Sequence, residues 1–352
     1  MTIWKRPGVA GAVYGLLLAA FTLYVVLDVF VIPRELPAPD LPESTAETTQ
    51  STAGTTENTT GSAESTAGTA PADGATGTAT VQKLPPEAAG ATASADEMTY
   101  ADDAVQISLT THRIAVSSVE STTVYVADIR LADVSLLKTA FARDTFGANI
   151  RAKTSDTAKA HGAILAINGD YYGARVKEGG YVLRNGTVYS SKALKTDADR
   201  TTGTIDDLVI WKDGRFSIIN EAETPMAQLV ENGARQVLAF GPAMLEDSRL
   251  RVGENEKGLV QALNPRTAIG VIEPGHYVFV VAEGRQKPKD CGISVYRLAL
   301  FMQELGVQTA YNLDGGGSSA LWFNGRLINH PTTDGKTFAE RGVSDIVYIG
   351  YQ

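Results

Sequence analysis

The chain has 352 residues, a formal net charge of -9 and a single cysteine, Cys291. Its basic residues form no cluster beyond the pair Lys5 and Arg6. Phosphate backbones are bound by clustered Lys and Arg, so no nucleic-acid partner is expected. One thiol cannot form an internal disulfide, which excludes a fold held by covalent cross-links.

An apolar run follows the basic pair and covers residues 7–32 with one charge, Asp28. Its uncharged part, 8–27, has about the 20 residues that a membrane-spanning helix requires. The run is longer than the apolar region of a cleaved signal peptide and lacks a convincing cleavage site. We therefore expect residues 1–34 to form a single-pass signal-anchor helix in the cell membrane. The basic flank predicts that the rest of the chain lies outside the cytoplasm.

Residues 35–98 are dominated by Thr, Ser, Ala, Gly, Pro and Glu, with almost no large apolar side chains. Such a segment cannot bury enough surface to offset its ordering entropy, so we expect a disordered linker that acts as a tether. The remaining residues, 99–352, suit one sizeable domain with a full core.

The folded part begins with strand signals. Alternating apolar residues over 124–131 predict a half-buried strand. The apolar run 162–167 predicts a buried strand that ends at Asn168. Hairpin turns are predicted at three dipeptides that accept positive φ, which are Asn185-Gly186, Asp213-Gly214 and Asn324-Gly325.

Helices are fewer. Ser294 can cap a helix that has one apolar face and stops at Gly306, and an apolar strand over 309–313 follows it. Residues 224–233 and 136–146 are two further helix candidates. Many strands with few helices predict an α+β fold. We expect a single domain with a mixed or antiparallel β-sheet and a few packed helices, preceded by a transmembrane helix and a disordered linker.

Four polar clusters lie where a strand gives way to a loop, which is where binding groups concentrate. The first runs from Asn168 through Gly169 and Asp170 to Tyr171 and Tyr172. Its carboxylate can face a cleft while the two rings stack on a sugar. It can equally be a turn in which the aspartate caps backbone groups and the tyrosines pack inside.

The second and third clusters each present an arginine. Arg266 follows Asn264-Pro265 at the start of a strand, where a guanidinium suits bidentate phosphate binding, although a surface ion pair is the commoner fate of an arginine. Glu283 and Arg285 follow the strand over 277–282 and, taken alone, have the composition of an ordinary charged turn.

The fourth cluster runs from Asn312 through Asp314 and three glycines, 315–317, to Ser318 and Ser319. Three consecutive glycines cost chain entropy, and they allow successive N–H groups to point at one anion. The loop is not a Walker loop, because a strand and not a helix follows it. We interpret it as an anion-binding nest.

Other chemistries lack support. The histidines, His112, His161, His276 and His330, lie far apart and without zinc-ligand spacing. No Gly-x-Ser-x-Gly elbow is present, and Cys291 lies outside any nucleophile motif. We expect no metal site and no cofactor, with a structural divalent cation such as Ca²⁺ left open.

Taken in order over about residues 109–351, these motifs resemble the phosphodiester glycosidase family. Its matching strings include the one around Arg266, the Gly-Arg-Gln at 284–286, and Arg341-Gly342-Val343 before the last strand. Where the family often has Asp before Gly-Arg-Gln, this chain has Glu283. The resemblance implies a hydrolase that cleaves a sugar from a sugar-1-phosphodiester, here in a cell-envelope glycan or exopolysaccharide.

The candidate site residues follow from the motifs and the resemblance together. The catalytic candidates are Asp170, Glu283 and Asp314. The candidates for binding substrate or phosphate are Asn168, Tyr171, Tyr172, Arg266, Arg285, Asn312, Gly315, Gly316, Gly317, Ser318 and Arg341. In this mechanism arginines and loop amides hold the phosphate, and Asp170 or Asp314 serves as nucleophile or as base for water.

Two other hypotheses fit the same clusters. A non-catalytic module would bind a phosphate-containing envelope glycopolymer without cleaving it. A metal-dependent phosphodiesterase would use the acidic loops to hold a cation.

Overall fold

The computed structural model describes residues 7–36, 98–172, 179–197, 204–254, 256, 258 and 260–352. The predicted linker over 35–98 therefore lies almost wholly outside the described residues. At its two ends, Glu35 lies in strand β1 and Met98 lies in strand β2, where the sequence predicted linker.

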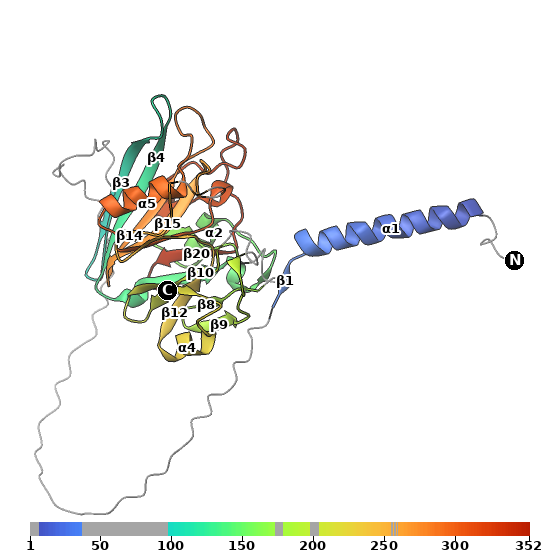
Figure 1. Cartoon of the computed structure of the whole chain (residues 1–352), viewed down its shortest axis with the longest axis horizontal. Coiled ribbons are helices and arrows are strands. Elements are labelled where there is room, and N and C mark those ends of the chain that lie inside the picture. The colour runs from blue at the N-terminus through green and yellow to red at the C-terminus, as the bar shows by residue number, and fades with distance from the viewer. Residues whose placement is uncertain are drawn as a thin grey trace, which may run out of the picture.

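The largest sheet among the described residues has eight strands in the order β14-β13-β17-β15-β16-β4-β3-β2. Figure 1 labels β3, β4, β14 and β15 of this sheet. Strand β4 alternates between more buried and less buried residues along most of its length, as the sequence predicted. The strands are β2 (Met98–Ala101), β3 (Val105–Ala115), β4 (Ser121–Leu131), β13 (Ala243–Glu246), β14 (Arg249–Leu250), β15 (Arg266–Glu273), β16 (His276–Ala282) and β17 (Thr309–Asn312).

Two five-stranded sheets pack against it. One has the order β19-β18-β7-β20-β5 and the other β11-β10-β12-β8-β9. The first comprises β5 (Leu137–Phe141), β7 (Leu165–Asn168), β18 (Leu321–Phe323), β19 (Arg326–Leu327) and β20 (Asp345–Ile349). The second comprises β8 (Val182–Arg184), β9 (Thr187–Ser190), β10 (Asp206–Trp211), β11 (Phe216–Asn220) and β12 (Ala234–Leu238). A short pair joins β1 (Arg34–Glu35) to β6 (Gly147–Ala148).

The main core lies between the large sheet and the two smaller ones. It takes Ile129 and Phe279 from the large sheet, Leu165 and Val347 from one small sheet and Leu208 from the other. Strand pairings among the described residues are antiparallel. The predicted α+β fold with an antiparallel sheet and few helices is confirmed.

Helix α5 (Val295–Glu304) covers the other face of the large sheet (Figure 1). Ser294 caps it by accepting a hydrogen bond from the amide of Arg297 at 3.2 Å. Its buried residues, including Leu298 and Met302, pack on a second apolar cluster with side chains of β15 and β16. This helix, its cap and the helix α4 (Met226–Glu231) agree with the sequence prediction.

The prediction of a helix over 136–146 is wrong. Those residues form strand β5 between two short 3-10 turns, Val134–Leu136 and Ala142–Asp144. Strand β5 pairs along its whole length with β20, so partners far along the chain decide its conformation. The sequence reading also missed the helix α2 (Thr154–Ala160).

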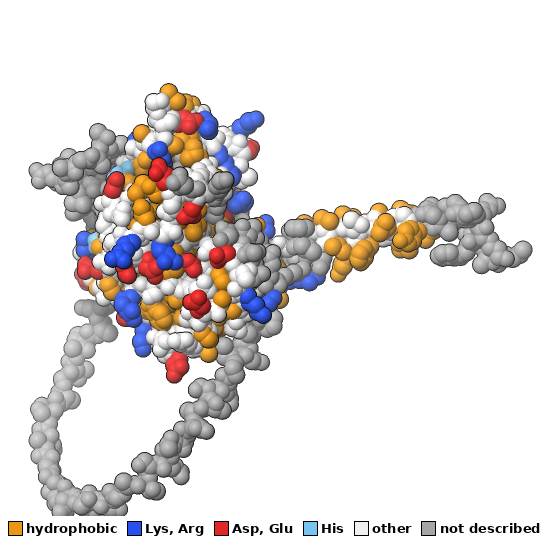
Figure 2. Space-filling model, viewed as in Figure 1, with side chains coloured by type: hydrophobic (Ala, Val, Ile, Leu, Met, Phe, Trp, Pro, Cys, Tyr) orange, Lys and Arg blue, Asp and Glu red, His pale blue; other side chains and the backbone are white. Residues whose placement is uncertain are grey.

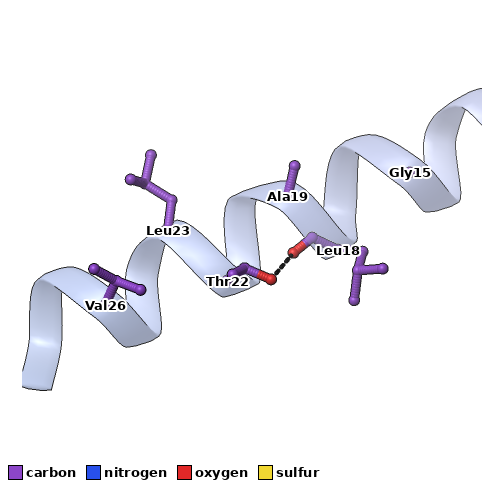
Figure 3. A pocket seen from close by; sticks show the side chains of 6 residues that line it. All are labelled: Gly15, Leu18, Ala19, Thr22, Leu23 and Val26. Atoms are coloured by element: carbon purple, nitrogen blue, oxygen red, sulfur yellow. Dashed lines mark hydrogen bonds between the residues drawn. The ribbon is translucent and has the colours of Figure 1, made fainter.

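Helix α1 (Pro7–Phe30) projects from the rest of the protein (Figure 1). It carries exposed apolar side chains (Figure 2). A shallow depression on it is lined by Gly15, Leu18, Ala19, Thr22, Leu23 and Val26 (Figure 3). These residues include no ionisable group, so the depression offers no acid–base chemistry.

In the part of the chain that the structure describes, no helix is both long and apolar enough to cross a membrane. The predicted transmembrane span is therefore not supported.

Candidate active site

Three strands of the large sheet deliver polar loops to one edge. Strand β15 is antiparallel to both neighbours, with Arg266 opposite Ala282 of β16 and Ala268 opposite Asn312 of β17. The start of β15 therefore lies beside the ends of β16 and β17. Strand direction alone brings the second, third and fourth polar clusters together.

Asn168, in strand β7 of a smaller sheet, connects the first polar cluster to the place where the other three lie. It is fully buried at the end of β7. Its Nδ2 donates to the carbonyl of Asp314 at 2.5 Å, and its Oδ1 accepts from the hydroxyl of Thr267 at 2.7 Å and the amide of Ala320 at 3.2 Å. This side chain is committed to holding two sheets together and is not exposed to a ligand.

The glycine loop is packed tightly against two neighbouring loops. A Cβ on Gly316 would lie 2.8 Å from Nη2 of Arg285, and one on Gly317 would lie 2.3 Å from Oγ1 of Thr333. Gly316 also has a φ of 62°, which side-chain-bearing residues rarely adopt. These two glycines are required because Arg285 and Thr333 approach the backbone so closely.

The amides of this loop are largely used within the protein. Gly316 donates to the carbonyl of Pro265 at 2.8 Å, while Ser318 and Ser319 donate back to Gly315 and Gly316 at 3.2 Å each. Of the three glycine amides that the predicted nest would use, the central one, that of Gly316, is therefore turned into the protein. Arginine side chains supply the positive charge at this loop.

Asp314 lies at the edge of the loop with 12% of its side chain exposed, and its Oδ2 is 3.6 Å from Nη2 of Arg341. Arg341 also donates to Oγ of Ser318 through Nε at 3.1 Å and Nη2 at 2.6 Å. A hydroxyl that accepts two bonds keeps its own proton to donate. Asp314, Arg341 and Ser318 are therefore connected, with the guanidinium group of Arg341 in contact with both the carboxylate and the hydroxyl.

Arg285 contacts the same loop from the end of β16. Its Nη1 donates to the carbonyl of Thr333 at 2.5 Å and its Nη2 to Oδ1 of Asn264 at 3.4 Å. Arg341 in turn donates to the carbonyl of Gly315 at 3.3 Å. Two partly exposed guanidinium groups therefore flank three consecutive glycines, which is an arrangement suited to an anion.

Arg266 is only 2% exposed and lies beneath the loop. Its Nε donates to the carbonyl of Ile293 at 3.2 Å and its Nη2 to that of Ala262 at 2.6 Å. Burial lowers the pKa of Arg266 to about 10. Its charge acts on the site through low-dielectric protein, but the side chain is not placed to meet a phosphate at the surface.

Asp170 does not face a cleft. Its Oδ2 lies 2.9 Å from Nη2 of Arg184 and 2.9 Å from the amide of Ala239, and its Oδ1 accepts from the amide of Tyr172 at 3.0 Å. Arg184 also binds Oδ2 of Asp345, through Nη2 at 2.8 Å and Nε at 3.0 Å. Asp170, Arg184 and Asp345 thus form a buried ion triad.

The two tyrosines of the first cluster differ in exposure. Tyr171 is 38% exposed, whereas Tyr172 is 3% exposed and stacks on Phe146 with ring centroids 5.2 Å apart. Only Tyr171 is therefore placed to meet a sugar. Asn312 is likewise buried, and its Nδ2 donates to the carbonyl of Gly241 at 2.7 Å.

Glu283 is buried beside His330. Its Oε1 accepts from the backbone amide of His330 at 2.8 Å and lies 3.2 Å from Nδ1 of the same residue and 3.4 Å from the hydroxyl of Tyr125. Burial raises the pKa of Glu283, and the hydrogen bonds from His330 oppose this shift. A carboxyl group that holds its proton more tightly is suited to act as an acid.

The sequence analysis missed Arg184 and Asp345. Arg184 ends an otherwise apolar strand directly before the Asn185-Gly186 turn, and Asp345 opens the apolar last strand. A charged residue inside an apolar strand is almost never fully buried unless it is paired. That signal was present at both positions, although it does not identify the partner.

Within the described ranges, no group of three or more His, Cys, Asp or Glu side chains could hold a metal ion. The donors at the glycine loop are instead guanidinium, hydroxyl and backbone groups around one carboxylate. The fold and the site together define an α+β protein with a polar, arginine-flanked site of the kind that enzymes use for phosphate esters.

A family model described as phosphodiester glycosidase matches residues 161–350, just over half of the chain. The chain belongs to the phosphodiester glycosidase family, and the resemblance seen in its motifs is confirmed. The matched range contains every candidate site residue named from the sequence.

Curated relatives agree with this assignment. A Bacillus subtilis SPbeta prophage-derived uncharacterized protein, YomE, is 31% identical over 208 residues, which is 58% of this chain and 31% of that protein. The mouse N-acetylglucosamine-1-phosphodiester alpha-N-acetylglucosaminidase is 27% identical over 56% of this chain and 40% of the enzyme. The chain thus matches well under half of the length of either relative.

A solved structure supports the fold. The catalytic domain of the zebrafish N-acetylglucosamine-1-phosphodiester alpha-N-acetylglucosaminidase, described as auto-inhibited by its pro-peptide, superposes with a TM-score of 0.56. The match covers 71% of this chain and 85% of that domain at 19% sequence identity.

Proposed function

We propose that the protein hydrolyses the bond between the anomeric carbon of a sugar and the phosphate of a sugar-1-phosphodiester. The observation that carries this proposal is the gathering of Arg285, Arg341 and Asp314 around the loop Gly315–Gly317. A carboxylate at the edge of a loop that two guanidinium groups flank suits a substrate in which an anion adjoins the bond to be cleaved.

Arg285 and Arg341 would hold the phosphate oxygens, with the hydroxyl of Ser318 as a third donor. A phosphate monoester leaves readily, so the site must mainly bind the phosphate and stabilise an oxocarbenium-like transition state. Arg266 would add positive charge from below while it holds the backbone in place.

Asp314 would act on the anomeric carbon, as nucleophile or as base for water. Of the three carboxyl groups expected to be catalytic, Asp170 is engaged through both oxygens in the buried triad and Glu283 is buried against His330. We assign Asp170 to positioning. Glu283, with its raised pKa, would supply a proton where the leaving group needs one.

The names of the relatives supply a first substrate, because the mouse and zebrafish enzymes are N-acetylglucosamine-1-phosphodiester alpha-N-acetylglucosaminidases. We propose N-acetylglucosamine-1-phosphodiesters as substrates, and a cell-envelope glycan or exopolysaccharide as the polymer that carries them. The exposed ring of Tyr171 would pack against the sugar.

We also propose from the sequence that the folded domain acts outside the cytoplasm and is attached to the cell membrane. The support is the pair Lys5 and Arg6 followed by the apolar run over 7–32. Protease added to intact cells should then degrade the domain, while a cytoplasmic marker protein survives. A protected domain would contradict this location.

The function is tested by incubating the full chain with an N-acetylglucosamine-1-phosphate diester of a simple alcohol. Release of free sugar, unaffected by a chelator, is the expected result. Binding without release would favour the glycopolymer-binding module, and activity that a chelator abolishes would favour the metal-dependent phosphodiesterase. Either of these outcomes would overturn the proposal.

A further inference from the structure

The buried triad lies directly behind the loop that carries Asp314. The side chains of Asp170 and Asp345 are 0% exposed, and that of Arg184 is 3% exposed. None of them is placed to touch substrate. Two fully enclosed acids therefore lie beside a site suited to an anion.

A chain of backbone contacts joins Asp345 to Asp314 through one residue. The amide of Gly169 donates to the carbonyl of Asp345 at 2.9 Å, and the carbonyl of Gly169 accepts from the amide of Asp314 at 3.3 Å. A Cβ on Gly169 would lie 2.3 Å from Oδ1 of Asp345. The Asp345 side chain therefore packs against the backbone link that holds Asp314.

The triad has two acids and one base. Arg184 binds Oδ2 of Asp345, while Oδ1 of Asp345 is buried without a hydrogen-bond partner among the described residues. A carboxylate oxygen without donors is costly to bury, so the neutral acid is favoured. Burial, and then the charge of Asp170, raise the pKa of Asp345 to about 8, and Arg184 opposes the shift.

Charged groups of both signs act on Asp345. Asp170, Arg184 and Asp314 all act on its charge, and the hydroxyl of Tyr172 responds to it in turn. With Asp345 neutral, Arg184 balances Asp170 and the triad carries no net charge. Loss of the proton would leave one uncompensated negative charge near Asp314 and the proposed phosphate site.

We propose that Asp345 is a positioning residue, which fixes the backbone of Asp314 through Gly169 and, as the neutral acid, keeps surplus negative charge away from the substrate phosphate. This inference rests on the proposed function, because its main readout is hydrolysis. Asp345 touches no substrate and acts only through its neighbours.

The experiment compares kcat/KM against pH for the full chain, Asp345→Asn and Glu221→Gln. Glu221 is a matched control, a buried acid that accepts hydrogen bonds from the amides of Tyr181 and Leu194. The wild type and the control should lose kcat/KM by about tenfold per pH unit above the pKa of Asp345. Asp345→Asn, which has no proton to lose at this position, should lack the fall that begins at this pKa.

An Asp345→Asn protein that loses activity equally at every pH, with the alkaline fall still in place, would overturn the inference. A wild type that releases no sugar at any pH would instead defeat the proposed function. If Asp345→Asn does not fold, infrared spectra of the wild type decide. The carbonyl band of a buried protonated carboxyl group, present near neutral pH, should disappear above the pKa of Asp345. Absence of that band would refute the neutral acid.

Discussion

Burial distinguishes acids that look equivalent in the sequence. Asp170 and Asp314 each follow an apolar strand, next to a glycine. Asp170 is enclosed by Arg184 and two backbone amides, whereas Asp314 keeps an exposed edge beside Arg341. Only a partly exposed carboxylate can reach an anomeric carbon without unfolding its surroundings.

Asp314→Asn should therefore reduce kcat by about a hundredfold or more, because the amide cannot serve as nucleophile or base. Thermal unfolding should change little, since the substitution preserves shape. Asp213→Asn is the control, because Asp213 pairs with Arg215 at an exposed hairpin turn. Turnover by Asp314→Asn equal to that of this control would exclude Asp314 from catalysis.

The sequence predicted a site residue correctly where the neighbouring residues explain its role. It failed where the role depends on contacts with residues far away in the chain. The sequence identified the glycine loop, but its tightness depends on Arg285 and Thr333, which belong to other loops. The sequence predicted that Arg266 binds phosphate. Motif spacing cannot show that this side chain is buried under the glycine loop.

At the scale of elements, local signals worked best where one segment determines its own structure. The Ser294 cap, the apolar face after it and the stop at Gly306 predicted α5 closely. The segment 136–146 was misread because β5 exists through its pairing with β20, about two hundred residues away in the chain. No local pattern reports such a partner.

Leu298→Ala on α5 should lower the free energy of unfolding by about 2–5 kcal/mol, because Leu298 is fully buried and the change leaves a cavity. Urea unfolding measures this loss. Glu304→Ala, at the exposed end of the same helix, should lie within about 0.5 kcal/mol of the wild type. Equal stability of the two variants would mean that α5 does not form part of the core.

At the scale of the whole molecule, antiparallel strand directions assemble the site. The start of β15 meets the ends of β16 and β17 at one edge, and Asn168 brings β7 to the same place. The sequence predicted the separate clusters and their family, but it did not predict the triad that supports them. Its members come from β8, from the loop after β7 and from β20.

The triad also predicts how stability changes with pH. The pKa of Asp345 is raised from 3.8 to about 8 by burial and by Asp170. An acid whose pKa is higher in the folded than in the unfolded state stabilises the fold. This contribution is full at pH values below the pKa of the unfolded state, and it is lost as pH rises through the pKa of the folded state. The free energy of unfolding should fall between these two pH values in the wild type and less steeply in Asp345→Asn. Parallel curves from urea unfolding at several pH values would contradict this.

The position of bond cleavage tests the account most directly. Hydrolysis of an N-acetylglucosamine-1-phosphodiester in ¹⁸O-labelled water, followed by mass spectrometry of both products, shows which atom the water attacks. Attack at the anomeric carbon should place the label in the released sugar and none in the phosphate monoester. Label in the phosphate would show that the phosphorus–oxygen bond is broken, and the glycosidase assignment would be wrong.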